Sequence, residues 1–161
     1  MAQKRVYLSG GMEYTEGEGA RWRSDLQDWF ERDMGHSVFN PNVESDNFFA
    51  KNYPAVEFRS LKKEDIALYQ EIVRRLVEID CGEIAERSDY VVCYWDEGAA
   101  RGAGTKGELT MAKFFDKPVY LVTSHPLEDI PGWVLGCTTK TFPGFEELKT
   151  YLSKKKLTGE Y

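Results

Sequence analysis

The architecture of the chain follows from one segment, Tyr90-Val91-Val92-Cys93-Tyr94-Trp95, which precedes a glycine-rich stretch from Gly98 to Gly107. A short apolar run bounded by turn residues is typical of a buried strand. A helix is expected from about Thr105, and its spacing places Leu109 and Ala112 on the inner face. A strand, a glycine-rich turn and a helix in this order predict a parallel sheet whose ligands bind beyond the carboxyl ends of the strands.

The rest of the chain repeats this alternation. Further strands are predicted at Arg5–Leu8, Ser37–Phe39 and Pro118–Val122, and helices at Ala20–Asp33, Ser60–Arg87 and Gly144–Lys155. A fifth strand, bent at Gly136, is expected within residues 133–142. Residues 43–55 are expected to form an irregular, aromatic-rich excursion that covers a binding site. We therefore predict a single doubly wound α/β domain over residues 1–161, Rossmann- or flavodoxin-like, with a mostly parallel five-stranded sheet.

Composition limits the function. The chain has 161 residues, enough to bury a core, and a net charge of −6, which disfavours binding to polymeric nucleic acid. No apolar run approaches the roughly 20 residues that cross a membrane, and the polar residues 1–5 lack a signal peptide's apolar region. A cytoplasmic location without membrane contact is expected.

Cysteine and histidine usage gives no metal pattern. The three cysteines, Cys81, Cys93 and Cys137, show no CxxC spacing, and the only histidines are His36 and His125. A zinc site and a Cys-His nucleophile pair are therefore not expected.

Glu108 is a candidate catalytic carboxylate, because Gly104-Thr105-Lys106-Gly107-Glu108 lies where the third strand gives way to a helix. The alternative is structural. Thr105 and Glu108 fit the S/T-x-x-E capping box, in which the glutamate only satisfies a backbone N–H.

Asp80 is the second candidate. Ile66, Tyr69, Val73 and Leu76 form an apolar stripe, and position 80 continues it with a carboxylic acid. A buried acid needs a partner, a raised pKa or a wet cavity. Alternatively, the helix breaks near Gly82 and Asp80 caps the next piece.

The turn Ser9-Gly10-Gly11 follows the first strand and could present N–H groups and a hydroxyl to a phosphate or a sugar. Glycines also occur where a chain simply bends. Tyr7 lies on the same side of the strand as Ser9; it is either a core residue or a side chain that orients a carboxylate.

Together these motifs resemble the nucleoside 2-deoxyribosyltransferase family. The resemblance spans residues 5–122 and rests on Tyr7–Gly11, Asn40-Pro41, Asp80 before Ser88–Val92, and Gly104–Leu109. The family includes transferases that exchange bases on 2-deoxyribose and nucleotide N-glycosidases that release the base to water. The resemblance implies a small-molecule nucleoside or nucleotide substrate, a Glu108 nucleophile, a proton donor at Asp80 and a positioning role for Tyr7. Chemistry of this kind would require neither a metal nor an organic cofactor.

The chain departs from the family pattern at two places. The spacing from Asp80 to Asp89 is one residue longer, and Gly102 stands where relatives carry an aspartate or serine, so Asp96 is a candidate substitute. Arg101 in the same loop is available to meet a phosphate. With Gly104 and Thr105, these residues complete the predicted substrate site.

Three functions remain open from the sequence. The first is deoxyribosyl transfer, the second is hydrolysis of a nucleoside 5'-monophosphate, and the third is a nucleotide-binding module without catalysis. The resemblance also implies a homo-oligomer in which neighbouring subunits complete each other's pockets, with the terminal Tyr161 as a candidate to reach a neighbour.

Overall fold

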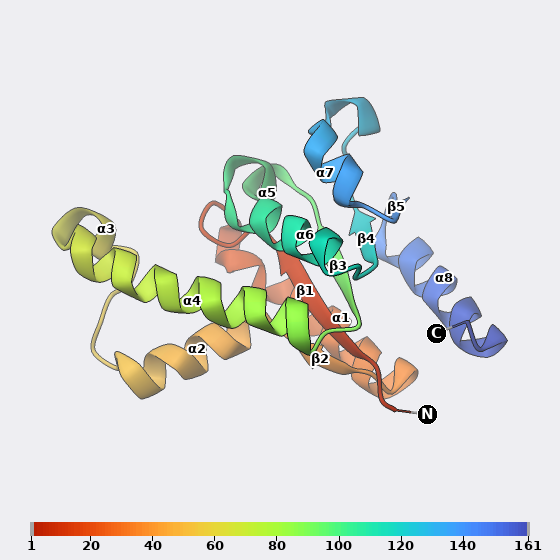
Figure 1. The fold of residues 1–161 in the computed structure, drawn as a ribbon, viewed down its shortest axis with the longest axis horizontal. Helices are drawn as coiled ribbons and strands as arrows, with labels where there is room; N and C mark the ends of the chain where they lie inside the picture. Colours follow the sequence, from red (N-terminus) through yellow and green to blue (C-terminus); the bar gives the residue numbers. More distant parts are fainter. Residues whose placement is uncertain (1, 161) are drawn as a thin grey trace.

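The computed structural model describes residues 2–160, so the expectation for Tyr161 lies outside the described residues. Five strands form one parallel sheet in the order β2-β1-β3-β4-β5 (Figure 1). Their bounds are β1 Arg5–Gly10, β2 Ser37–Phe39, β3 Tyr90–Tyr94, β4 Val119–Val122 and β5 Lys140–Phe142. This is the flavodoxin-type order, in which the chain reverses direction across the sheet between β1 and β3. The predicted fold class is confirmed.

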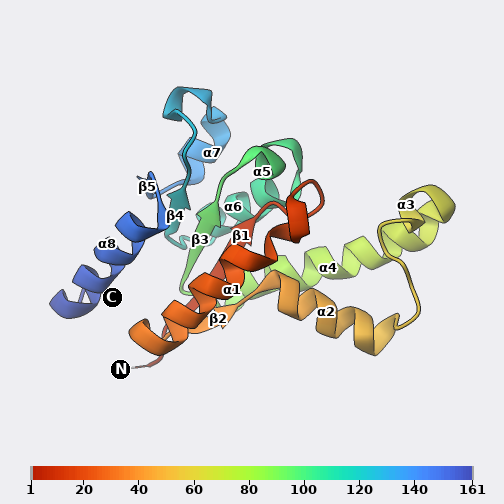
Figure 2. The same ribbon diagram turned by 180° about the vertical axis from the view of Figure 1, so that it is seen from behind.

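Helices cover both faces of the sheet (Figures 1 and 2). Apolar side chains of α1 and α8 bury one face, and those of α4, α6 and α7 bury the other. The helices are η1 Glu16–Gly19, α1 Ala20–Trp29, η2 Phe30–Met34, α2 Pro41–Asn52, α3 Leu61–Glu64, α4 Ile66–Glu86, α5 Glu97–Arg101, α6 Gly104–Phe114, η3 Leu127–Asp129, α7 Gly132–Cys137 and α8 Phe145–Thr158.

Alternation along β1 places its side chains. Val6 and Leu8 pack with the α1 and α8 residues, whereas Tyr7 belongs to the core that includes Leu109 of α6. Ser9 has the same parity as Tyr7, because successive side chains of a strand point to opposite faces. β1 therefore presents a tyrosine and a serine to the face that carries α6.

The expectation of an irregular segment at residues 43–55 is wrong for most of its length. Pro41–Asn52 forms α2, and the Asn40 side chain accepts a hydrogen bond from the Asn42 N–H at 3.1 Å. Asn40 is thus the N-cap of α2, and Pro41 occupies the first helical position, where its missing N–H costs nothing.

The expectation of a strand beginning at Trp133 is also wrong. Residues 132–137 form α7, with Val134 and Cys137 buried and Trp133 exposed, and only Lys140–Phe142 joins the sheet. A short apolar run does not distinguish a buried strand from a buried helical turn.

The predicted helix over residues 60–87 is two helices, separated at Asp65. The Asp65 carboxylate accepts a hydrogen bond from the Leu68 N–H at 3.0 Å and caps α4, which then runs without a break past Gly82. α2 and α4 extend together beyond the sheet, with α3 at the far end (Figures 1 and 2).

Candidate active site

The Glu108 carboxylate is held by two side chains of β1. Tyr7 Oη donates a hydrogen bond to Glu108 Oε1 at 2.9 Å, and Ser9 Oγ donates one to Oε2. The residue at the N-cap of α6 is Ala103, and no side chain caps this helix. The capping-box alternative for Glu108 is therefore wrong; both of its oxygens accept hydrogen bonds from the neighbouring strand.

Packing fixes the two donors. Tyr7 and Ser9 are fully buried, and the Phe39 ring of β2 stacks on the Tyr7 ring with centroids 5.1 Å apart. A phenol held in this way has little rotational freedom, so its hydroxyl stays directed at Glu108. The strand thus orients the carboxylate before any ligand arrives.

Asp80 shares a cavity with Glu108. Asp80 lies in the middle of α4, so it does not cap a helix, and both acids line a cavity of about 690 Å³. This volume is within the usual range for small-molecule sites. The cavity is lined by Gly10 at the carboxyl end of β1 and by Gly98 of α5, the helix after β3, so it lies at the edge of the sheet where ligands of this fold type bind.

The two acids differ in protonation. Burial and the nearby Glu108 carboxylate raise the pKa of Asp80 to about 8. Burial also raises the pKa of Glu108, but the hydrogen bonds from Ser9 and Tyr7 and the charge of Arg23 oppose this rise. The hydrogen bonds from Ser9 and Tyr7 thus favour the ionised form of Glu108, whereas burial and the Glu108 charge favour the protonated form of Asp80.

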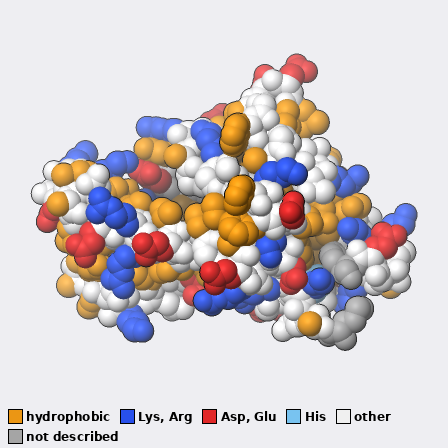
Figure 3. All heavy atoms as spheres, viewed as in Figure 1, with side chains coloured by type: hydrophobic (Ala, Val, Ile, Leu, Met, Phe, Trp, Pro, Cys, Tyr) orange, Lys and Arg blue, Asp and Glu red, His pale blue; other side chains and the backbone are white. Residues whose placement is uncertain are grey.

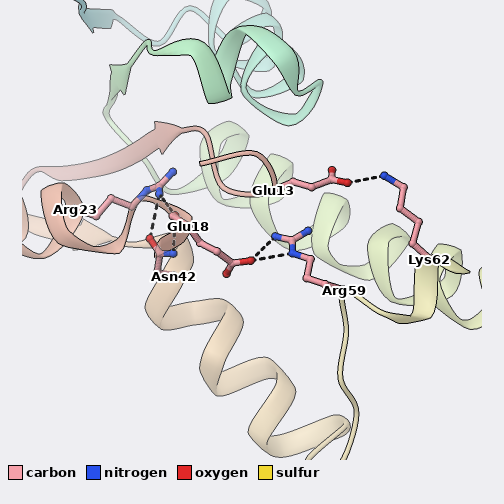
Figure 4. Close-up of polar contacts among 6 residues, drawn as sticks. All are labelled: Glu13, Glu18, Arg23, Asn42, Arg59 and Lys62. Atoms are coloured by element: carbon pink, nitrogen blue, oxygen red, sulfur yellow. Dashed lines mark hydrogen bonds and ion pairs between the residues drawn. The ribbon is translucent and has the colours of Figure 1, made fainter. Parts of the chain in front are cut away.

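Arg23 is buried beneath the turn that follows β1. Its guanidinium donates to the backbone carbonyls of Leu8 at 3.1 Å, Gly10 at 2.9 Å, Glu18 at 3.0 Å and Gly19 at 3.4 Å, and to Asn42 Oδ1 at 3.1 Å. Figure 4 shows its contact with Asn42. These bonds engage all three nitrogens, so Arg23 supports the turn rather than offering a free cation to a ligand.

The glycines of this turn permit close packing. A Cβ on Gly11 would lie 2.2 Å from Thr15 Oγ1, and a Cβ on Gly98 would lie 1.9 Å from the same atom. The turn after β1 and the start of α5 therefore interlock around Thr15, which brings both segments to the cavity wall.

The predicted substrate residues divide into two groups. Gly10, Gly11, Gly104 and Thr105 line the cavity with Glu108. Three others, Ser9, Asp96 and Arg101, lie outside that lining among residues 2–160; Ser9 is fully buried and donates to Glu108. The Asp96 carboxylate caps α5 by accepting from the Ala99 N–H at 2.8 Å, and the Arg101 guanidinium lies 4.2 Å from the centre of the Tyr14 ring.

Further aromatic and charged residues complete the cavity wall, and Phe48 and Phe49 belong to the aromatic segment that was expected to cover a binding site. The aromatic side chains of Phe48, Phe49, Phe58 and Tyr69 line it, so α2 does border the site, although as a helix. Glu18 and Arg59 also line it and form an ion pair, with Arg59 Nε 2.9 Å from Glu18 Oε1 (Figure 4). No sequence signal joins these two residues, because they are 41 positions apart and belong to different segments.

No group of three or more His, Cys, Asp or Glu side chains within residues 2–160 is arranged to hold a metal ion. In the same part of the chain, no helix combines the length and apolar character that a membrane span requires.

No known protein family matches the chain by sequence, and no curated protein does so either. In fold, the chain is similar to the solved structure of a CMP N-glycosidase, BcmB, from Clostridium botulinum. The two are 14% identical, with a TM-score of 0.52, and the similarity covers 92% of this chain and 97% of that one. The similarity extends over nearly the whole of both chains and concerns their fold.

Proposed function

We propose that the protein cleaves the N-glycosidic bond of a nucleoside or nucleotide, with Glu108 as the nucleophile. The observation that carries the proposal is the pairing of two unlike acids in one cavity: Glu108, held by Tyr7 and Ser9, and Asp80, whose pKa is raised to about 8. Pairs of carboxyl groups with separated pKa values are typical of glycosidic bond cleavage.

In the proposed first step, a Glu108 carboxylate oxygen bonds to the anomeric carbon while the bond from that carbon to the base nitrogen breaks. The electron pair of the broken bond leaves with the base, which takes the proton of Asp80. Covalent catalysis of this kind replaces one difficult displacement with two easier ones. Tyr7 and Ser9 keep the attacking carboxylate in place.

In the second step, water or another base displaces Glu108 from the sugar. The incoming nucleophile gives a proton to the Asp80 carboxylate, and Glu108 regains its negative charge. Both acids thus return to their starting states, and the cycle consumes only the substrate and the acceptor.

The similarity in fold to a CMP N-glycosidase supports this class of chemistry. The proposal of a non-catalytic binding module rested on Glu108 and Asp80 being helix caps, and neither residue occupies a cap position. The acids are therefore available for chemistry in the cavity.

The test is to incubate the protein with the 2'-deoxynucleosides and their 5'-monophosphates, with and without an added acceptor base, and to separate the products by chromatography. We expect free base without the acceptor if the enzyme is a hydrolase, and an exchanged base only with it if the enzyme is a transferase. Glu108→Gln should abolish both products while ligand binding persists. Product formation by the Glu108→Gln protein would overturn the mechanism.

The homo-oligomer stays a prediction. The side chains of Ile66, Val77 and Ile79 on α4 are exposed, and Figure 3 shows hydrophobic side chains over this helix. Measurement of the mass in solution by light scattering tests the prediction, since a monomer would have a mass of 18.5 kDa.

A further inference from the structure

We propose that Glu18, by holding Arg59, makes the cavity select an uncharged nucleoside over the corresponding 5'-monophosphate. This inference rests on the proposed function, because it concerns the substrate of the same cavity. It narrows the substrate class that the acids at positions 80 and 108 would act upon.

The wall of the cavity is strongly acidic. Besides Asp80 and Glu108, five acidic residues line the cavity, namely Glu13, Glu18, Glu44, Asp46 and Glu57. Among the lining residues that the structure describes, Arg59 is the one lysine or arginine. A phosphate monoester carries a charge of about −1.5 to −2 at pH 7 and would be repelled by this wall.

The basic side chains at the cavity are already paired with carboxylates. Arg59 Nη2 lies 2.7 Å from Glu18 Oε1, and its Nε lies 2.9 Å from the same oxygen. Lys62, from the adjoining segment, pairs with Glu13, as Figure 4 shows. Both basic residues are therefore neutralised by carboxylates of the turn that follows β1.

The remaining basic residues near the site are engaged as well. Arg23 donates to five acceptors below the turn, and Arg101 lies over the Tyr14 ring. Lys106, in the first turn of α6, donates to the carbonyls of Ala100 at 2.7 Å and Gly102 at 3.0 Å. A phosphate would have to break one of these contacts to gain a cationic partner.

An uncharged 5'-hydroxyl does not meet this obstacle. The carboxylates that line the cavity can accept a hydrogen bond from a hydroxyl, whereas they repel a phosphate. The same wall therefore favours the nucleoside.

Measurements of ligand binding test this inference independently of catalysis. We would titrate the Glu108→Gln protein with the four 2'-deoxynucleosides and their 5'-monophosphates and measure each Kd by calorimetry. For the base that binds best, the nucleoside should bind at least ~10-fold more tightly than the monophosphate, an affinity ratio that corresponds to one close charge interaction in a partly exposed site.

Substitution of Glu18 tests its role. In the Glu108→Gln background, Glu18→Gln frees the Arg59 guanidinium and should tighten monophosphate binding by ~10-fold, with nucleoside binding nearly unchanged. Glu16→Gln is the matched control, because it removes an exposed charge from the same turn without freeing Arg59. Adding Arg59→Gln to the Glu18→Gln protein should cancel the gain.

The outcomes are distinct. Equal or tighter binding of the monophosphate, or no binding of either ligand class, would overturn the inference. An equal gain from Glu16→Gln, or no gain from Glu18→Gln, would remove Glu18 as the determinant. Selective nucleoside binding with no base released by the unsubstituted protein would support the inference and refute the proposed function.

Discussion

Tyr7 Oη lies 2.9 Å from Glu108 Oε1, although the two residues are 101 positions apart in the chain. The contact joins the first strand to the helix that follows the third, across the point where the strand order reverses. A carboxylate that is held from the strand side presents its remaining lone pairs to the cavity. This relationship makes Glu108 a better candidate nucleophile than a carboxylate that rotates freely.

Tyr7→Phe is expected to lower kcat by ~10- to 100-fold, the usual effect of losing one hydrogen bond to a charged group. The acidic limb of the pH–rate profile should move to higher pH, because the Tyr7 hydroxyl favours the ionised form of Glu108. Tyr151→Phe, on the opposite face of the sheet, is the control. A Tyr7→Phe protein with an unchanged profile would show that the contact does not position the carboxylate.

The basic limb of the same profile should reflect Asp80. Because the proposed proton donor has its pKa raised to about 8, kcat should fall as the pH rises through that value. Asp80→Asn should remove this limb and lower the rate by ~100-fold or more, and Glu78→Gln on the exposed side of α4 should alter neither. Retention of the limb in Asp80→Asn would assign it to another group.

The Asp80 carboxyl group should also lower the free energy of unfolding at neutral pH, compared with an uncharged side chain at this position. Its pKa is about 8 in the folded protein and about 3.9 in an unfolded chain, so the folded state binds the proton more tightly. The contribution of Asp80 to the free energy of unfolding therefore decreases as pH rises from about 4 to about 8. Asp80→Asn should raise Tm relative to the unsubstituted protein, with a difference that grows across this interval in thermal melts. A difference that is constant with pH would contradict the raised pKa.

Arg23→Gln should destabilise the protein by on the order of 3 kcal/mol, because it leaves several buried carbonyl groups without a donor. Arg21→Gln, an exposed position two residues earlier in α1, should change the free energy of unfolding by less than about 0.5 kcal/mol. Urea denaturation of both variants provides the comparison. Equal stability of the two variants would be inconsistent with a structural role for Arg23.

Gly98→Ala should cost about 1–3 kcal/mol, because the new Cβ would meet Thr15 Oγ1 at 1.9 Å. Gly82→Ala in α4 has open space around the new Cβ and should stabilise the protein by about 0.5–1 kcal/mol through helix propensity. Denaturant melts of the two variants should thus shift in opposite directions. A shift in the same direction would argue against the interlock of Thr15 with Gly98.

Much of the fold could be predicted from local patterns. The strands at Ser37–Phe39 and Tyr90–Tyr94 and the helix from Gly104 were expected within one or two residues, because periodicity and turn residues act over short distances. The errors at residues 41–52 and 132–137 share a cause. In both segments a proline stands at the start of a short helix, and only the packing of the apolar face shows that a helix follows.

The candidate site was also predicted in part from the sequence. The residue types at positions 7, 9, 80 and 108 could be selected from the sequence, because alternation in a strand and a polar break in an apolar stripe are local features. That Asp80 faces the cavity of Glu108, that Arg23 is enclosed by carbonyl groups and that Arg59 pairs with Glu18 required the folded chain. These relationships depend on how α4, α1 and the segment after α2 pack around the sheet. Local sequence determines which side chains each helix or strand can present. The distances between side chains of different elements, and the pKa shifts that depend on those distances, arise only when folding excludes water and brings distant charges together.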